Sequence, residues 1–219
     1  MFTNPFSNWL NARKSRKTRR TVLVKQLHER DRRRVLKHFL ALDDSDRLLR
    51  FGTKLPDELV ETYVRKIDFV HDTVYGVYNP VFKLVAVGHL AFAPKESTHA
   101  LSSTTKDIVA EFGVSVSASA RGLGIGSKLF QRAAIRCRNL DVDTLYMHCL
   151  SSNQTMMHIA KKAGMEIQRD YGEADAYLRL LPPDPASMLR EAIDEQVAII
   201  DYTLKANTRA AVKFFVAKK

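Results

Sequence analysis

The sequence predicts an α/β fold, in the α+β sense of strands and helices around one core, and three observations predict it. Two β-branched runs flank the turn-forming pair Asn79-Pro80, which predicts a hairpin. A third such run, residues 108–116, leads through a glycine-rich turn into an amphipathic stretch. Strand-like and helical patterns alternate again after it. With 219 residues, 45% of them hydrophobic, the chain can form one domain of ordinary size with its own core.

The first half of the predicted domain begins with strand-like alternation and continues with helical spacing. Apolar residues at positions 35, 36, 39 and 40 share one helical face. A second helix is expected near Pro56 and Asp57, which suit a first helical turn. In order, we expect a strand at 21–27, the first helix, a connector at 44–52, the second helix at 55–67, hairpin strands at 73–78 and 83–92, and a loop at 94–105.

The second half contains the longest helical pattern of the domain. It follows the strand at 108–116 and repeats apolar residues at steps of three and four: Ile125, Leu129, Phe130, Ala133, Ala134 and Cys137. Pro182-Pro183 ends the core, because adjacent prolines continue neither a sheet nor a helix. We further expect a strand at 144–150, a helix from Asn153, strands at 166–171 and 174–181, an appended amphipathic helix at 187–205 and a strand-like segment at 212–216.

The formal net charge of +11 is distributed unevenly, because six cations lie between Arg13 and Arg20. This composition favours a solvated, disordered tail at residues 1–20, ahead of a domain at 21–181 and an extension at 182–219. The alternative is a tail that contacts nucleic acid or an anionic membrane, with four apolar residues as its anchor: Phe2, Phe6, Trp9 and Leu10. The basic excess also suits a ligand with several phosphates.

The turn Arg121-Gly122-Leu123-Gly124-Ile125-Gly126 is the strongest functional signal in the sequence. It joins a predicted strand to a predicted helix, so the first N–H groups of that helix lack partners and the helix dipole adds positive potential there. A bound phosphate accepts hydrogen bonds from these N–H groups, and its negative charge is stabilised by the positive potential. Glycine removes the Cβ that would keep the ligand away, and it accepts positive φ. The turn therefore predicts a nucleotide-type ligand.

Two common phosphate-binding motifs do not fit this turn. A dinucleotide-binding fingerprint requires a third glycine where Ser127 stands and an acidic residue at the end of the next strand, whereas Asp141 and Asp143 precede that strand. A phosphate-binding P-loop closes with Gly-Lys-Ser/Thr, and Gly126-Ser127-Lys128 has the last two residues reversed.

The turn resembles motif A of the GNAT superfamily of N-acetyltransferases, in which Arg121, Gly124 and Gly126 fill the signature. The resemblance extends over about residues 21–181: the strand before the turn resembles the family's fourth strand, and Asn153, Lys162 and Gly164 match its next helix. It implies a central mixed, mostly antiparallel sheet of six to seven strands flanked by about four helices. The C-terminal amphipathic helix is then an addition to the GNAT fold.

The resemblance also implies acetyl-CoA as co-substrate, without a metal. The fourth strand, which diverges from the fifth in the family, would offer backbone groups at Val114 and Val116 to the pantetheine arm. The turn would hold the pyrophosphate through N–H groups, with a charge-assisted contact from Arg121. The implied cofactor-binding residues are Val114, Val116, Arg121, Gly122, Leu123, Gly124, Ile125, Gly126, Ser127 and Asn153.

Glu111 is the candidate base for transfer to an amine. A lysine-type amine has a pKa near 10.4, so a carboxylate that accepts its proton is useful, and part-burial would raise the pKa of that carboxylate. Glutamates in similar strands are proposed as bases in GNAT enzymes that modify protein lysines. Alternatively, Glu111 points to solvent or pairs with Arg121. Family position adds Arg50 and Phe51 to the acceptor pocket, and His89 is an alternative base.

One departure from the family concerns the leaving group. Ala160 stands where many members carry a tyrosine that protonates the CoA thiolate, so this role is vacant or filled elsewhere. Thiolates leave with little assistance near neutral pH, because the free thiol pKa is about 8.5.

Other patterns limit the class of protein. There is no apolar run of eighteen residues and no signal-peptide core, and the cysteines, Cys137 and Cys149, suit reduced core thiols, so we expect a cytoplasmic protein. His148 and His158 lack partners at ligand spacing, and no metal site is expected.

The leading hypothesis is an acetyl-CoA-dependent N-acetyltransferase that acetylates a primary amine of a small molecule or a protein lysine by direct transfer in a ternary complex. A non-catalytic acyl-CoA-binding regulatory module of the same fold is the alternative, in which Ala160 marks lost chemistry. A third hypothesis is a nucleic-acid-binding protein that acts through its basic tail. The appended helix either packs on its own domain or forms a homodimer.

Overall fold

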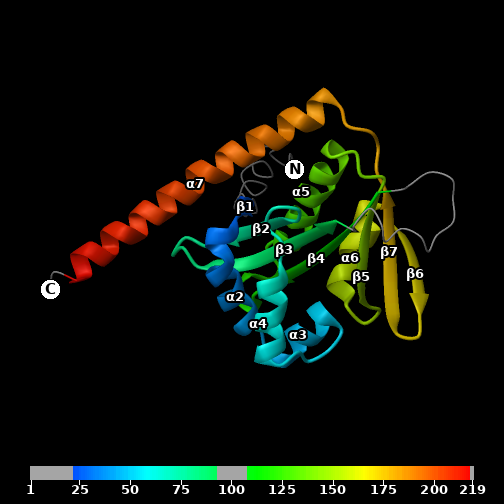
Figure 1. The fold of residues 1–219 in the computed structure, drawn as a ribbon, viewed down its shortest axis with the longest axis horizontal. Coiled ribbons are helices and arrows are strands. Elements are labelled where there is room, and N and C mark those ends of the chain that lie inside the picture. Colours follow the sequence, from blue (N-terminus) through cyan, green and yellow to red (C-terminus); the bar gives the residue numbers. More distant parts are fainter. Residues whose placement is uncertain (1–21, 93–107, 218–219) are drawn as a thin grey trace, which may run out of the picture.

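The structure, a computed structural model, describes residues 22–92 and 108–217 and contains one seven-stranded sheet (Figure 1). Its spatial order is β1-β2-β3-β4-β5-β7-β6. Only β4 and β5 pair in parallel, which confirms the expected mixed, mostly antiparallel sheet. The strands are β1 (Lys25–Leu27), β2 (Thr73–Tyr78), β3 (Leu84–Phe92), β4 (Val109–Val116), β5 (Thr144–Leu150), β6 (Glu166–Asp170) and β7 (Glu173–Arg179).

Helices cover both faces of this sheet. They are α2 (Arg32–Leu40), α3 (Asp44–Phe51), α4 (Asp57–Lys66), α5 (Ile125–Asn139), α6 (Gln154–Ala163) and α7 (Pro185–Ala217), with short turns η2 (Glu29–Asp31) and η4 (Ala118–Ala120). Neighbouring residues of β2 enter different cores: Val74 packs with Phe39 and Val60 of α2 and α4, whereas Tyr75 belongs to the cluster of α5 and α6. Because side chains alternate along a strand, these two clusters occupy opposite faces.

The segment 44–52, expected as a connector, is helix α3, so that expectation is wrong. Asp43 caps the helix by accepting a 2.8 Å hydrogen bond from the N–H of Asp46, and Gly52 ends it with a left-handed φ of 74°. An Asp cap and a glycine after the last turn are ordinary helix signals, although a helix of eight residues shows little periodicity. α3 carries Arg50 and Phe51.

The C-terminal extension also differs from expectation. It forms one helix of 33 residues, α7, which includes the segment 212–216 that was expected to be strand-like. Its first half lies along α5, and its end projects beyond the domain (Figure 1). Arg132 on α5 forms a 2.8 Å ion pair with Glu195 on α7. Among the described residues, no helix is both long enough and apolar enough to cross a membrane.

Candidate active site

The strands β4 and β5 separate at the centre of the molecule. Their parallel pairing covers three residue pairs and ends where Glu111 meets Tyr146. β4 continues to Val116 and stays paired with β3 over that length. The β5-facing backbone of β4 beyond Glu111 therefore borders an opening, as the sequence comparison with GNAT enzymes implies.

The glycine turn follows β4 and leads directly into α5. Gly122 and Gly124 both have a φ of 74°, the left-handed conformation that a Cβ disfavours. Gly124 is the N-cap of α5, so the free N–H groups of the first turn lie beside it. At Gly126 a Cβ would lie 3.1 Å from Ile159 on α6, and glycine therefore permits the close approach of these helices.

A cavity of about 530 Å³ connects this turn with the opening between β4 and β5. Most of the predicted cofactor residues line it: Val114, Val116, Arg121, Gly122, Gly124, Ile125, Gly126, Ser127 and Asn153. Leu123 does not line it, and its side chain is 59% exposed. The Asn153 side chain accepts a 3.1 Å hydrogen bond from the N–H of Met156 and donates one of 3.3 Å to the carbonyl of Leu49, so it joins α6 to α3.

Arg121 forms an ion pair with Asp46 of α3 rather than with Glu111, contrary to one interpretation of the sequence. Asp46 is buried and lines the same cavity, while the Arg121 side chain is 49% exposed. The guanidinium therefore lies beside the glycine turn with solvent access. Asp46 is a site residue that the sequence does not reveal, because it lies 75 positions away from Arg121.

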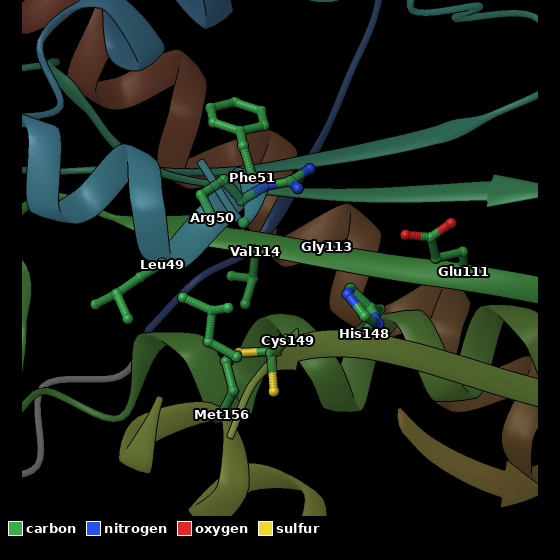
Figure 2. A pocket seen from close by; sticks show the side chains of 11 residues that line it. Leu49, Arg50, Phe51, Glu111, Gly113, Val114, His148, Cys149 and Met156 are labelled. Carbon is green, nitrogen blue, oxygen red and sulfur yellow. The ribbon is translucent and has the colours of Figure 1, made fainter. Parts of the chain in front are cut away.

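A second cavity, of about 190 Å³, adjoins the first and shares four of its lining residues: Leu49, Arg50, Val114 and Met156. Figure 2 shows Glu111 on β4, the side chain of Arg50 from α3 above the same strand, and His148 on the neighbouring strand. Phe51 and Cys149 also line this cavity. Glu111 is exposed, so the expectation of a part-buried carboxylate is wrong.

His89 lines neither cavity, although the sequence predicts it as an acceptor residue. Its Nδ1 lies 2.9 Å from the hydroxyl of Tyr63, and its Nε2 lies 2.9 Å from Asp72. Tyr63 in turn accepts a 2.7 Å hydrogen bond from Arg50. Both ring nitrogens of His89 therefore have polar partners. His89 fixes the position of Tyr63, and Tyr63 in turn fixes that of Arg50.

On the β5 side, His148 contacts a carboxylate that sequence spacing does not reveal. Its Nδ1 lies 2.8 Å from Asp175 of β7, and the hydroxyl of Tyr146 donates a 2.6 Å hydrogen bond to the same oxygen. Both hydrogen bonds lower the pKa of Asp175, and the bond from Tyr146 has the larger effect. Antiparallel pairing places Asp175 opposite His148, so only the sheet register brings them together.

The larger cavity has a buried polar contact on its β4 wall. Ser115 lines the cavity, and its hydroxyl lies 2.7 Å from Nε2 of His38 on α2. Burial, supported by the charges of Lys83 and Arg50, lowers the pKa of His38 to about 4, so the imidazole is neutral at pH 7. Ser115 is buried on one face of β4, while Val114 and Val116 are partly buried on the other face, where they pack against the cluster of α5 and α6 and border the cavity.

Comparisons with known proteins identify this arrangement. The model of the acetyltransferase (GNAT) family matches residues 56–165, half of the chain. The chain belongs to the GNAT family. The match includes β4, the glycine turn and all of α6. A search of curated proteins gives no match.

Solved structures share the fold at low sequence identity. The GNAT domain of PAT from S. lividans is 18% identical, with a TM-score of 0.57 over 72% of this chain and 89% of that chain. A phosphinothricin acetyltransferase from Sinorhizobium meliloti, in complex with AcCoA, is 13% identical, with a TM-score of 0.57 over 75% and 95%. yncA from Salmonella typhimurium, with its cofactor acetyl-CoA, is 12% identical, with a TM-score of 0.53 over 75% and 99%. The family supports acetyl transfer from acetyl-CoA as the general activity.

Proposed function

We propose that this GNAT protein is an acetyl-CoA-dependent N-acetyltransferase that transfers an acetyl group to a primary amine by direct transfer in a ternary complex. The observation that carries the proposal is the junction of two cavities at the point where β4 leaves β5. One contains a phosphate cradle, and the other contains a carboxylate. Two substrates can therefore approach the same stretch of β4 from different sides.

The larger cavity fits acetyl-CoA. Left-handed glycines and the open start of α5 suit a pyrophosphate, and Arg121 can add a charge-assisted contact. The backbone near Val114 and Val116 would hold the pantetheine arm. Acetyl-CoA supplies the acetyl group as a thioester. Backbone N–H groups of β4 near Val116 would stabilise the tetrahedral oxyanion, because they are fixed by the sheet on the other side of the strand.

Glu111 accepts the proton of the attacking amine in this proposal. Its carboxylate lines the smaller cavity, immediately before the separation of β4 from β5. Exposure gives Glu111 a path for passing the proton to solvent. General bases of this kind contribute about 10²- to 10⁴-fold to the rate.

A non-catalytic acyl-CoA-binding module is the second candidate, and the surroundings of Ala160 favour it. Ala160 is 1% exposed within the core and lines neither cavity, so no proton donor occupies the family's tyrosine position. Both candidates predict acetyl-CoA binding, but only the N-acetyltransferase predicts turnover. The basic tail, on which the nucleic-acid hypothesis depends, lies outside the described residues.

Calorimetric titration with acetyl-CoA, free CoA and NADH tests the cofactor assignment. Binding of both CoA species without binding of NADH is the expected result, and an acceptor screen with thiol detection then tests catalysis. Acetyl-CoA binding without transfer to any amine would favour the regulatory module. Absence of CoA binding would contradict both candidates, and salt-dependent binding to DNA or RNA would then be examined.

A further inference from the structure

Arg50 carries a charge that no carboxylate neutralises among the described residues. Its guanidinium carbon lies 5.0 Å from the ring centre of Phe51, 5.5 Å from that of Tyr63 and 5.9 Å from that of Phe39. Nη2 donates to the Tyr63 hydroxyl, while Nε is buried without a hydrogen-bond partner. A charge held among aromatic rings without a carboxylate beside it is costly, so an anionic ligand at the guanidinium would reduce this cost.

The position of this guanidinium is fixed by its surroundings. A Cβ on Gly113 would lie 2.5 Å from Nη2 and 2.6 Å from the guanidinium carbon, so Arg50 lies directly against the backbone of β4. The chain of hydrogen bonds through Tyr63, His89 and Asp72 holds it from the other side. Arginine stays protonated at all physiological pH values and matches the geometry of a carboxylate. The cavity therefore contains a fixed cation.

Glu111 provides an anion on the same wall of the cavity. It lies two residues before Gly113 on β4, and alternate residues of a strand point to the same face. No ion pair joins it to Arg50 in the described part of the chain, so the two opposite charges stay apart within one cavity. Figure 2 shows both side chains above the same strand. A ligand with an amine and a carboxylate would complement both charges.

We propose that the acceptor is an amine that also carries a carboxylate, an amino acid or a close analogue, with its carboxylate bound by Arg50 and its amine directed to Glu111. This inference rests on the proposed N-acetyltransferase function. The volume of about 190 Å³ suits a small molecule, since pockets for drug-sized ligands begin at about 300 Å³. A polyamine has no group for Arg50 and meets its positive charge.

The test compares amino acids with their α-amides, which keep the amine and replace the carboxylate by a neutral group. Purified full-length protein is assayed with acetyl-CoA and each member of the pairs. We expect kcat/KM to be about 10- to 100-fold higher for at least one amino acid than for its amide. Equal rates for both members of every pair would overturn the inference and leave the N-acetyltransferase function standing.

Two variants test the role of Arg50 independently. Arg50→Met should reduce kcat/KM for the amino acid much more than for the amide, mainly through KM, so that the preference for the acid is lost. Gly113→Ala retains Arg50 but displaces it through its Cβ and should have the same selective effect. An equal loss for acid and amide would assign Arg50 to the reaction itself or to folding and overturn the inference. Calorimetry with acetyl-CoA shows whether each variant keeps its cofactor site.

If the wild-type protein binds acetyl-CoA and acetylates no amine, with or without a carboxylate, the N-acetyltransferase proposal fails together with this inference. If it acetylates amines that lack a carboxylate and no amino acid, only the inference fails. The two failures are therefore distinguishable in one set of assays.

The helix α7 carries a second inference from an independent observation, because large apolar side chains also lie on its face away from the domain. Its inner face packs Ala198 and Tyr202 against the domain, and Lys205 donates a hydrogen bond to the carbonyl of Tyr78. The outer face carries a stripe at helical spacing with exposed fractions of 54–63%: Leu189, Ile193, Ile200 and Leu204. An ordinary surface helix carries polar residues on its outer face.

The charges on α7 indicate what covers this stripe. Between residues 185 and 205, Glu191, Asp194 and Glu195 form ion pairs with basic residues of α5, and Asp201 pairs with Lys205. Arg190 is the one further charged residue of this part of the helix. Helices that bind anionic membranes are rich in Lys and Arg beside the apolar face, and nucleic acid also requires cations. The uncharged stripe is complementary to itself when two helices pack antiparallel about a two-fold axis. We infer that a second copy of this chain covers the stripe.

Sedimentation equilibrium of the full chain tests this pairing. The wild type should be dimeric at micromolar concentration. Ile200→Glu should produce monomers, since it places a charge within the stripe. Thr208→Glu adds the same charge to an exposed position beside the stripe and should leave the dimer intact. A monomeric wild type, pelleting of the protein with anionic vesicles, or equal effects of both variants would contradict this pairing.

Discussion

Acidification should destabilise the protein through His38 by an amount that follows from its burial. His38 is 4% exposed, and its folded-state pKa of about 4 lies below the ordinary value of 6.5. Between these values the unfolded chain binds more protons than the folded chain, so the free energy of unfolding decreases as the pH falls from about 6.5 to about 4. The loss amounts to about 2–3 kcal/mol at pH 4.5, since one pKa unit corresponds to about 1.4 kcal/mol.

Urea unfolding at about pH 7 and pH 4.5 measures this effect, with His38→Gln as the matched variant. Glutamine can still bond to Ser115 but carries no titratable group, while the paired carboxylates that also respond to acid remain in both proteins. We expect the wild type to lose about 2–3 kcal/mol more than the variant over this interval. Equal losses would refute the reasoning, because they would show that His38 is not held neutral by burial.

Three further predictions concern the cradle, the base and the core. Gly124→Val should abolish acetyl-CoA binding measured by calorimetry, because a β-branched residue cannot adopt the φ of 74° at the start of α5; retained affinity would remove this turn from the site. Glu111→Gln should slow turnover by about 10- to 10⁴-fold in steady-state assays and leave acetyl-CoA affinity unchanged, whereas unchanged turnover would exclude Glu111 as the base. Phe39→Ala should lower the free energy of unfolding by about 3–5 kcal/mol in urea titrations, because Phe39 is fully buried; a loss below 1 kcal/mol would contradict its core position.

The proposed cofactor site can be predicted from the sequence because its residues are consecutive. Strand, glycine turn and helix are consecutive, and the positive φ values of Gly122 and Gly124 require glycine at fixed positions. The physical demands on a phosphate cradle are therefore expressed within a few neighbouring residues. The same holds for the hairpin, whose first strand β2 has the predicted bounds.

The proposed acceptor site could not be predicted in the same way, because its contacts join residues that are distant in the sequence. Asp175 reaches His148 only through the register of β5 and β7. His89 was expected at the acceptor, but its partners Tyr63 and Asp72 come from other segments and place it behind Arg50. Strand periodicity assigns Ser115 to one face of β4. It does not show that this face packs against a histidine of α2.

In the proposed function both substrates bind along β4, and the spacing of residues in a strand gives the distance between Glu111 and Arg50. Glu111 and Gly113 point to one face, and their Cα atoms are about 6.6 Å apart, because each residue advances about 3.3 Å. The guanidinium of Arg50 lies on Gly113, so the base and the fixed cation are separated by about one strand repeat. A ligand whose amine and carboxylate are close together fits between them, whereas a long diamine places its second charge against Arg50. Val114 follows Gly113 and lines both cavities, so the proposed acceptor site adjoins the proposed acetyl-CoA site. The residue that permits this arrangement is Gly113, because a side chain there would move Arg50 and leave Glu111 without its counterpart.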